Sequence, residues 1–325
     1  MKHIITGGLG FIGINLAKAL IKMNEEVVIL DNFSNSINTK VKSTYLSNKI
    51  QIIESNLDIK TEALNAFEKA IGSNKVINNV WHLAANSNIP SGVKNIEVDF
   101  KDTFLTTFNS LEACKIFKIK NFYFASSSAI FGDHKSKIIS ENEGPLMPLS
   151  NYGAMKLASE ALCFAAYENF LNNLRVFRFP NVVGCPATHG VIKDFLKKLD
   201  KDENCLNVLG NGYQEKSYLH VSDLIKAMIY LSDTNLRIND NPIFNLGPNN
   251  DSVKVSWIAE KVVKYYKPNA KIKYGSENKG WLGDVPKFFY DTTKANDYGW
   301  KASLSSEKAV LKAIKEIISD HKKFI

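Results

Sequence analysis

The sequence predicts an α/β fold: a doubly wound parallel sheet of the Rossmann type, with a smaller C-terminal α/β substrate-binding lobe. Two observations carry this prediction. Short apolar runs alternate with helical patterns through the first 180 residues, and a glycine-rich turn joins the first run to the first helix. Buried runs separated by helical segments are typical of βαβ units, and helices on both faces of the sheet make it doubly wound.

The strands expected in the first half are runs rich in β-branched and aromatic residues at 2–6, 26–30, 50–53, 76–83, 121–125 and 174–179. The first helix is expected over 11–23, where Ile12, Leu16, Ala19 and Leu20 recur at helical spacing. A helical stretch also precedes each of the last two runs. This order gives parallel strands joined by crossover helices.

After about residue 180 the alternation loosens. Helices are expected at 192–199, 221–232, 255–266 and 308–318, and short strands at 205–209, 217–219, 243–246 and 271–273. No linker rich in Pro, Gly or Ser separates the halves. We therefore expect a nucleotide-binding domain over 1–180 and a second lobe over 181–325, packed together with some crossover of the chain.

The composition suits a soluble globular protein, with 325 residues of which 45% are hydrophobic and 23% charged. No apolar run approaches the roughly 18–20 residues that span a bilayer, so no membrane association is expected. The N-terminus lacks a basic segment ahead of an apolar stretch and a cleavage site, which favours a cytoplasmic protein.

Charge and cysteine usage exclude two further classes. The 41 basic and 33 acidic residues give a net charge of +8, but the lysines are spread along the chain, which disfavours nucleic-acid binding and is compatible with mild steering of an anionic substrate. The four cysteines stand far apart without C-x-x-C spacing. No metal site and no disulfide framework are expected.

Three glycines, Gly7, Gly10 and Gly13, lie between the first strand and the first helix. Glycine there permits a tight turn, a close approach of the backbone to a pyrophosphate, and close packing of helix on strand, while the helix N-terminus attracts the phosphates. Asp31 ends the second strand, where it can accept both ribose hydroxyls of an adenosine. Its charge repels a 2′-phosphate and no arginine follows it nearby, so NAD is favoured over NADP.

Tyr152 and Lys156 lie four residues apart at the start of a helical stretch, on one helix face. A free tyrosine has a pKa of about 10 and is a poor base at neutral pH. An ammonium ~5–6 Å away contributes about 3 kcal/mol at an effective dielectric near 20, or roughly two pKa units. We therefore expect Lys156 to lower the pKa of Tyr152 towards the range of a general base.

A serine triplet at 126–128 follows the strand at 121–125. Ligands of doubly wound sheets bind at the carboxyl ends of the strands, so one of these hydroxyls could hydrogen-bond a substrate oxygen beside the tyrosine. Serines at strand ends also make ordinary turns. The triplet therefore indicates a site only in combination with the glycine turn and the Tyr152–Lys156 pair.

Together these segments resemble the extended short-chain dehydrogenase/reductase family, specifically its NAD-dependent nucleotide-sugar epimerase/dehydratase branch, of UDP-glucose 4-epimerase type. The matching motifs occur in the family's order: TGGLGFIG, LDNFS, HLAA, the serine strand, YGAMK, RFPNVVG, SYLHVSD and GDVP with YDTTKA near the C-terminus. The resemblance spans residues 2 to about 300.

The resemblance implies a role for each matching position. Counted back from Phe131 and Gly132, the active-site hydroxyl is Ser127; Tyr152 is the base, and Lys156 binds the nicotinamide ribose. The cofactor residues it implies are Gly7, Gly10, Phe11, Ile12, Gly13, Asp31, Asn32, Asp58, Ile59, Leu83, Ala84 and Ala85, with Tyr152 and Lys156. The substrate residues it implies are Ser127, Asn181, Val191 and Lys216. A nucleotide-diphosphate sugar as substrate and a homodimer, formed through helices at 99–117 and 152–170, are also implied.

The same resemblance narrows the reaction. The branch's 4,6-dehydratases carry Asp-Glu after the active-site hydroxyl and its decarboxylases a Glu, whereas Ser128 and Ala129 follow Ser127 here. The expected reaction is a 4-epimerisation through a 4-keto sugar, in the setting of surface-polysaccharide biosynthesis. A nucleotide-sugar 4-dehydrogenase is the alternative, and a non-catalytic NAD-binding protein of the same fold is a third possibility.

Three positions depart from the family's pattern. Asp99 stands where many relatives have an asparagine, Lys216 where a phosphate-binding arginine is usual, and Trp281 where some have a second arginine. Lysine keeps the charge but loses the bidentate geometry of arginine. Lys254 and Lys279 are the lysines that could compensate.

Overall fold

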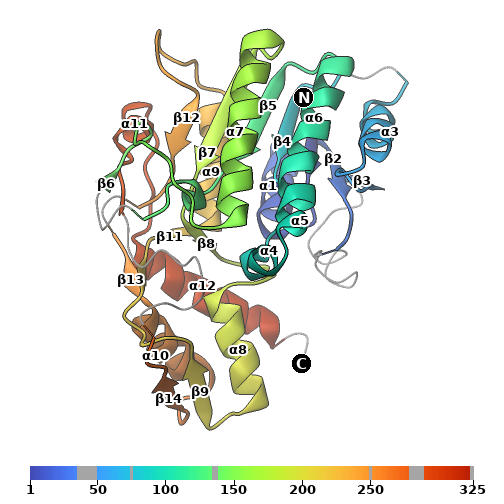
Figure 1. Cartoon of the computed structure of the whole chain (residues 1–325). Coiled ribbons are helices and arrows are strands. Elements are labelled where there is room, and N and C mark those ends of the chain that lie inside the picture. The colour runs from blue at the N-terminus through green and yellow to red at the C-terminus, as the bar shows by residue number, and fades with distance from the viewer. Residues whose placement is uncertain (35–49, 74–75, 134–137, 249–250, 278–288, 323–325) are drawn as a thin grey trace. The chain divides into compact units, whose positions relative to one another are not determined.

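The computed structural model describes residues 1–34, 50–73, 76–133, 138–248, 251–277 and 289–322, in two compact units (Figure 1). Unit 1 comprises Met1–Ile130, Ser150–Arg178 and Leu231–Ile243. Unit 2 comprises Phe131–Leu149, Phe179–Tyr230 and Phe244–Ile325. The chain therefore enters each unit three times.

Unit 1 is built on a sheet of seven strands in the order β12-β7-β5-β4-β1-β2-β3, and the pairs from β7 to β3 are parallel. The strands are β1 (Lys2–Thr6), β2 (Glu26–Asp31), β3 (Gln51–Glu54), β4 (Asn79–His82), β5 (Asn121–Ala125), β7 (Asn173–Arg178) and β12 (Ile243–Asn245). The predicted parallel sheet is confirmed. Its central strands β1, β4 and β5 are buried almost throughout, as expected of strands covered on both faces.

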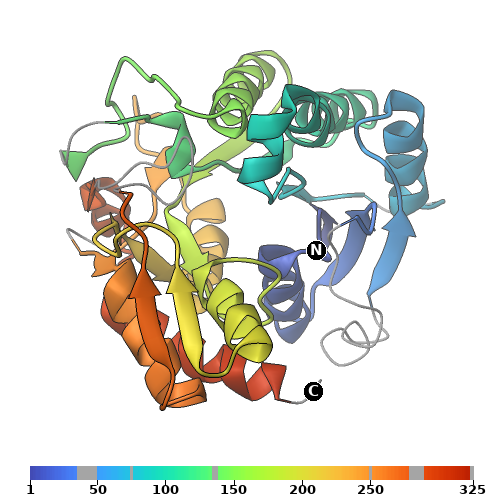
Figure 2. The same ribbon diagram turned by 60° about the horizontal axis from the view of Figure 1, so that its bottom comes forward.

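Helices cover the two faces of this sheet (Figures 1 and 2). The helical elements of unit 1 are α1 (Phe11–Lys22), α3 (Lys60–Ile71), α4 (Ile89–Lys94), α5 (Ile96–Asp99), α6 (Thr106–Ile116), α7 (Asn151–Asn169) and the short 3₁₀ turn η2 (Ser128–Ile130). Phe67 of α3, Leu111 of α6 and Cys163 of α7 share one core with Val80 and Phe122 of the sheet. Alternate strand residues thus face this helix layer.

The helix expected over 99–117 is interrupted. α5 ends at Asp99, a π-helical segment η1 (Phe100–Leu105) follows, and α6 continues from Thr106. Two threonine hydroxyls bond back to backbone carbonyls within this stretch, Thr106 to Asp102 at 2.8 Å and Thr107 to Thr103 at 2.9 Å. Such back-bonding perturbs a helix, and π-segments are frequent at functional sites.

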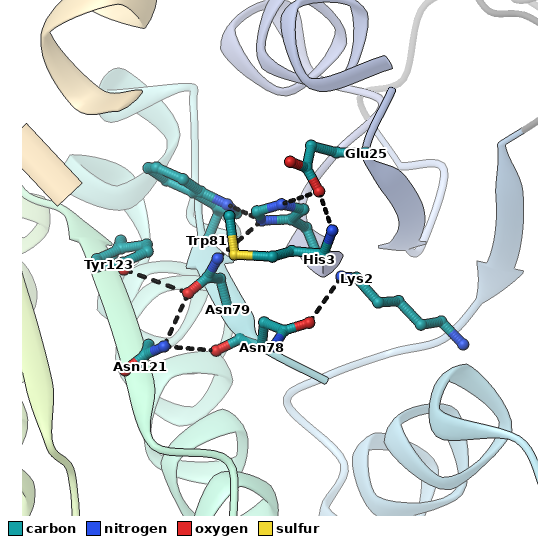
Figure 3. A network of polar contacts seen from close by, with 9 residues as sticks. Lys2, His3, Glu25, Asn78, Asn79, Trp81, Asn121 and Tyr123 are labelled. Atoms are coloured by element: carbon teal, nitrogen blue, oxygen red, sulfur yellow. Dashed lines mark hydrogen bonds and ion pairs between the residues drawn. The ribbon is translucent and has the colours of Figure 1, made fainter. Parts of the chain in front are cut away.

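The amino ends of β1, β4 and β5 carry a polar network (Figure 3). His3 Nδ1 accepts from Trp81 Nε1 at 3.1 Å and from Asn79 Nδ2 at 3.2 Å. The side-chain oxygen of Asn79, Oδ1, accepts from Asn121 Nδ2 at 3.0 Å and from the Tyr123 hydroxyl at 3.2 Å. Because the strands are parallel, this network lies at the sheet edge opposite their carboxyl ends. It gives hydrogen-bond partners to buried polar side chains of three neighbouring strands.

Unit 2 is a set of strand pairs and helices. β8 (Asn181–Val183) pairs with β11 (Tyr218–His220), β9 (Cys205–Val208) with β14 (Lys271–Tyr274), β10 (Glu215–Lys216) with β13 (Val253–Lys254), and β6 (Ile138–Ile139) with β15 (Phe289–Tyr290). The helices are α8 (Val191–Lys201), α9 (Val221–Ser232), α10 (Val255–Tyr266), α11 (Thr293–Asp297) and α12 (Ser306–His321). α8, α10 and α12 pack around one apolar core. No helix in the described residues is both long and apolar enough to cross a membrane.

Candidate functional site

The turn after β1 is held closed by its own backbone. Gly7 N donates to Leu30 O at 2.8 Å and Gly10 N to Gly7 O at 3.1 Å. A Cβ on Gly13 would lie 2.5 Å from Gly8 Cα, and one on Gly7, whose φ is +63°, would lie 2.8 Å from Ala84 Cα. Gly7 and Gly13 therefore sit where a side chain does not fit, as expected of a tight turn in which helix and strand pack closely.

The N-terminus of α1 is open to an anion. Gly10 is its N-cap, no side chain caps it, and its first turn contains no acidic residue. Phe11 and Ile12 are half-buried residues of that turn. The unpaired N–H groups and the helix dipole suit a phosphate, as the sequence predicts.

Asp31 connects the turn to the end of β2. Its Oδ2 accepts from Leu9 N at 2.9 Å and its Oδ1 from Phe33 N at 2.8 Å. Both bonds orient the carboxylate at the end of β2. The neighbouring Asn32 is exposed, and its side-chain oxygen accepts from Ser34 N at 3.1 Å, which shapes the turn.

Two further predicted segments are held by residues that sequence reasoning missed. Asn109 of α6 donates to the carbonyls of Leu57 and Asp58 at 2.8 and 3.0 Å, just before the exposed Ile59. Thr6 Oγ1 accepts from the backbone N–H groups of Leu83 and Ala84 at 3.2 and 3.3 Å.

The hydroxyl of Thr6 is itself placed by His82. His82 Nδ1 lies 2.8 Å from Thr6 Oγ1, and its Nε2 lies 3.0 Å from Thr107 Oγ1. Burial lowers the pKa of His82 well below its usual value, so the ring is neutral. Leu83, Ala84 and Ala85 follow it at the carboxyl end of β4, all half-buried. In the sequence, the histidine directly before the apolar residues 83–85 was the one sign that a side chain positions this loop.

Tyr152 and Lys156 converge as the i, i+4 spacing predicts. Lys156 Nζ lies 5.9 Å from the centroid of the Tyr152 ring and donates to Ala125 O at 2.7 Å. Ala125 ends β5, two residues before Ser127, whose hydroxyl hydrogen-bonds Tyr152. Ser127 Oγ also accepts from Ala129 N at 3.2 Å. Ser127, Tyr152 and Lys156 therefore form one cluster at the carboxyl edge of the sheet.

The expected lowering of the Tyr152 pKa is not found, and that prediction is wrong for the chain alone. Burial raises the pKa of Tyr152 to about 12; the hydrogen bond from Ser127 opposes this rise, and the charge of Asp99 adds to it. Burial also lowers the pKa of Lys156 to about 7. Desolvation thus disfavours the Tyr152 phenolate and also removes part of the positive charge on Lys156 that was expected to stabilise it.

A buried ion pair lies behind this cluster. Arg178 at the end of β7 donates to both carboxylate oxygens of Glu160, at 3.0 and 2.7 Å, and Ser126 Oγ donates to the same carboxylate. Both charged side chains are nearly inaccessible to solvent. Glu160 lies one helical turn beyond Lys156 on the same face of α7. The pair thus joins α7 to the ends of β5 and β7, and the sequence analysis did not single it out.

The remaining predicted residues belong to unit 2. Asn181 begins β8 and is exposed, and it is in register with Tyr218 of β11, two residues after Lys216. Lys216 pairs with Val253 across β10 and β13, next to Lys254. Val191 is half-buried against the core of unit 2 as the first residue of α8. Trp281 and Lys279 lie outside the described residues.

The residues of unit 1 fit a dinucleotide. The glycine turn has no room for a Cβ at Gly7 or Gly13. The N-terminus of α1 has no side-chain cap, and Asp31 is held in place at the end of β2. These features match a pyrophosphate and a ribose diol in turn. Phe11 to Gly13, Asp58, Ile59 and the stretch from Leu83 to Ala85 surround the same strand ends.

Comparison with known proteins agrees with this geometry. The family model described as "NAD dependent epimerase/dehydratase family" matches residues 3–247. A protein of Methanocaldococcus jannaschii named putative UDP-glucose 4-epimerase is 28% identical over 324 residues, which cover 96% of each chain.

Solved structures match along the whole chain. A crystal structure of a UDP-galactose 4-epimerase superposes with a TM-score of 0.83 at 30% identity and covers 98% of this chain and 99% of that chain. The UDP-glucose 4-epimerase of Thermus thermophilus, solved in complex with NAD, superposes with a TM-score of 0.80 at 21% identity, over 98% and 99% of the two chains. At 21% identity, the similarity to the Thermus thermophilus structure shows a shared fold only.

Proposed function

Because the chain belongs to the NAD-dependent epimerase/dehydratase family, we propose that it is a nucleotide-sugar 4-epimerase that oxidises and reduces its substrate transiently at C4. The observation that carries the proposal is the cluster of Ser127, Tyr152 and Lys156 at the strand edge that also holds the glycine turn. The names of the most similar relatives support the same substrate class, a nucleotide-diphosphate sugar.

Each residue of the cluster has one task. Tyr152 Oη takes the proton of the C4 hydroxyl, and Ser127 hydrogen-bonds the reacting oxygen. Lys156 reaches the nicotinamide ribose and, in its protonated fraction, places an ammonium beside the phenol. NAD, when bound, supplies the acceptor for the C4 hydride and a positively charged ring. In the reverse half, Tyr152 would return its proton to the 4-keto oxygen while the hydride returns to the opposite face of the sugar. This would give the epimer with no net change in cofactor.

A nucleotide-sugar 4-dehydrogenase is the second candidate, because it shares every step up to the 4-keto sugar. Dehydration is disfavoured, since Ser128 and Ala129 follow Ser127 and neither can serve as an acid or base for elimination. The two candidates differ in one observable. The epimerase leaves NADH absorbance unchanged over many turnovers, whereas the dehydrogenase accumulates NADH in proportion to product.

The test begins with the purified protein. Mass spectrometry of the denatured sample identifies the bound nucleotide, and incubation with UDP-, GDP-, CDP- and dTDP-sugars follows, with product separation and absorbance at 340 nm. NAD in the sample and an epimeric product without NADH support the proposal. A protein that neither retains nor binds NAD, or one that converts no nucleotide sugar, contradicts it.

Tyr152→Phe removes the proposed base without removing the ring. We expect kcat to fall by about 10²–10⁴-fold while NAD content stays near that of the wild type. The matched control is Tyr167→Phe, the same substitution on the same helix, where the ring packs against the core of unit 1 and turnover should persist. Near-normal turnover of Tyr152→Phe would overturn the mechanism.

The proposal extends to the second unit and to the setting. Asn181 and Lys216 are the candidates for contact with the substrate's diphosphate. The β8–β11 pairing supports this, because it sets Asn181 opposite Tyr218, two residues after Lys216 in the chain. Val191 is the third candidate for substrate contact. We also propose a cytoplasmic homodimer, or a higher homo-oligomer, of surface-polysaccharide biosynthesis. Exposed apolar side chains at Ile96, Phe100 and Phe108 support an oligomer formed through this segment.

A further inference from the structure

Two consecutive residues at the end of β5 are held by side chains of α7, which lies over this part of the sheet (Figure 1). Lys156 Nζ donates to the carbonyl of Ala125, the last residue of β5, at 2.7 Å. One turn further along the helix, Glu160 accepts from the hydroxyl of Ser126. The next residue is Ser127, the proposed active-site hydroxyl. The helix that carries the proposed base therefore contacts the strand end immediately before this serine.

The same strand end is also fixed by β7. Ser126 N donates to Phe177 O at 2.8 Å. Arg178, which ends β7, donates to both carboxylate oxygens of Glu160, at 3.0 and 2.7 Å. Ser126, Glu160 and Arg178 are only 1%, 1% and 3% exposed, so water does not compete for their hydrogen bonds. These three side chains, which we call the Glu160 clamp, join β5, α7 and β7 at one point.

The Glu160 clamp calls for a reason other than stability. Removing two charges from water costs about as much free energy as their attraction gains, so an apolar pair of the same size would stabilise the fold as well. An apolar pair would not give direction, however. The carboxylate of Glu160 accepts its hydrogen bonds only along its lone pairs, and it thereby fixes the position of Ser126 on one side and of Arg178 on the other.

We propose that Glu160 is a positioning residue: its carboxylate fixes α7 against the end of β5, so that Ser127 and Tyr152 reach the same substrate oxygen. Arg178 supplies the opposite charge that allows this carboxylate to be buried. The inference rests on the proposed roles of Ser127 and Tyr152. It adds to them the group that sets the two reacting side chains, one on a strand end and one on a helix, at a fixed distance.

The test is Ser126→Ala, which removes one bond to Glu160 and leaves the ion pair in place. Glu160→Gln is less suitable, because it leaves Arg178 a buried cation without its counter-charge and destabilises the whole unit. In Ser126→Ala we expect kcat to fall by about 10–100-fold, as for small displacements of reacting groups. The NAD content and the KM for the nucleotide sugar should stay close to those of the wild type.

Ser55→Ala is the matched control. Ser55 directly follows β3 as Ser126 follows β5, is 4% exposed, and its backbone N–H likewise donates to a neighbouring strand, to Asp31 O at 3.0 Å. Its hydroxyl donates to Glu62 O of α3 at 3.2 Å. The substitution therefore removes a comparable buried bond between a strand end and a helix, away from the reacting groups, and turnover should persist.

A double-mutant cycle separates positioning from a general loss of structure. If the Glu160 clamp acts through Ser127, then Ser126→Ala should lower kcat by less than about twofold in a Ser127→Ala background, whereas a merely structural role multiplies the two losses. Three results would overturn the proposal: near-normal kcat in Ser126→Ala, an equal fall of kcat in Ser55→Ala, or full multiplication of the losses in the cycle.

A readout without turnover separates this proposal from the proposed function. In protein labelled with ¹³Cζ-tyrosine, Tyr152→Phe identifies the Tyr152 resonance, whose shift reports the surroundings of the phenol. The resonance should move in Ser126→Ala and stay in place in Ser55→Ala, and this result supports the proposal even if no nucleotide sugar is converted. A Tyr152 resonance that is unchanged in Ser126→Ala refutes it even if epimerisation is found.

Discussion

The glycines of the turn differ in how much room each has for a side chain. The distance from an added Cβ to its nearest neighbour ranks how poorly each position would tolerate substitution. A Cβ on Gly13 would press on the backbone of Gly8 at 2.5 Å, whereas one on Gly10 would approach Gly7 O at 3.2 Å. Backbone cannot yield as the far end of a flexible side chain can. Gly13 is therefore the position at which the contact between α1 and the turn is least tolerant.

Gly13→Ala is expected to displace the turn. We predict roughly tenfold weaker NAD binding or worse, and a loss of about 1–3 kcal/mol in the free energy of unfolding, as for other overpacked sites. Calorimetric NAD titration and denaturant unfolding measure both. Gly144→Ala is the control, because a Cβ there has no heavy atom within 4 Å. Equal NAD affinity in the two variants would refute the ranking.

Among the elements, α7 carries most of the chemistry. Its first turn holds Tyr152, its second Lys156 and its third Glu160, so a single helix face presents the proposed base, the neighbouring lysine and the partner of Arg178. Ser150 is the N-cap of this helix, and its side chain accepts from Gly153 N at 3.1 Å. The position of Tyr152 therefore depends on how firmly this first turn is capped.

Ser150→Ala removes that cap. We expect a loss of about 1 kcal/mol in stability, and a fall in kcat because fraying of the first turn displaces Tyr152. Ser305→Ala is the matched control, since Ser305 caps α12 in unit 2 by accepting from Lys308 N at 3.3 Å. Thermal unfolding should fall similarly in both variants, and kcat only in Ser150→Ala. Equal kcat in the two would contradict the role of the cap.

At the scale of the whole molecule, the two ends of the parallel strands serve different purposes. The carboxyl ends carry the glycine turn, Ser127 and the loop after His82, whereas the amino ends carry the His3 network. His3 Nδ1 accepts from two donors, so its neutral ring carries the proton on Nε2, 3.6 Å from Glu25 Oε2. A second proton, on Nδ1, would make both His3 Nδ1 and Trp81 Nε1 donors, and their hydrogen bond would be lost.

The pH dependence of stability should reveal this network. Burial lowers the pKa of His3 to about 4, against the opposing effect of Glu25, while in the unfolded chain a histidine titrates near 6.5. Between these values the unfolded state binds the extra proton and the fold does not. Stability is therefore complete above about pH 6.5 and falls as pH decreases towards 4, by at most about 1.4 kcal/mol per pH unit.

His3→Gln keeps an acceptor for Trp81 and removes the titration. Its free energy of unfolding, measured by denaturant titration at pH 4–7, should decline less steeply than that of the wild type. A carboxyl such as Glu25, whose pKa is lowered by the N-terminal ammonium, still contributes below about pH 4.5 in both proteins. Parallel curves for variant and wild type above that pH would contradict the account of His3.

Local pattern was sufficient for much of the site. The i, i+4 spacing of Tyr152 and Lys156, the glycine spacing and the acid at the end of β2 are each encoded within a few residues, and the structure brings them to one sheet edge. The contacts of Thr6, Asn109 and Asp99 were beyond such reasoning, because their partners are 13 to 78 residues away along the chain. Those contacts exist only once the sheet has formed.

By itself the sequence determined the parallel sheet and the order of its elements, and it indicated which groups to propose as reacting groups, since periodicity and spacing are local properties of a chain. Only the tertiary structure decided the energetics of those groups. Burial raises the pKa of Tyr152 to about 12 and lowers that of Lys156 to about 7, the reverse of what their spacing alone implies for the tyrosine. Desolvation depends on everything packed around a side chain, and no local pattern encodes it.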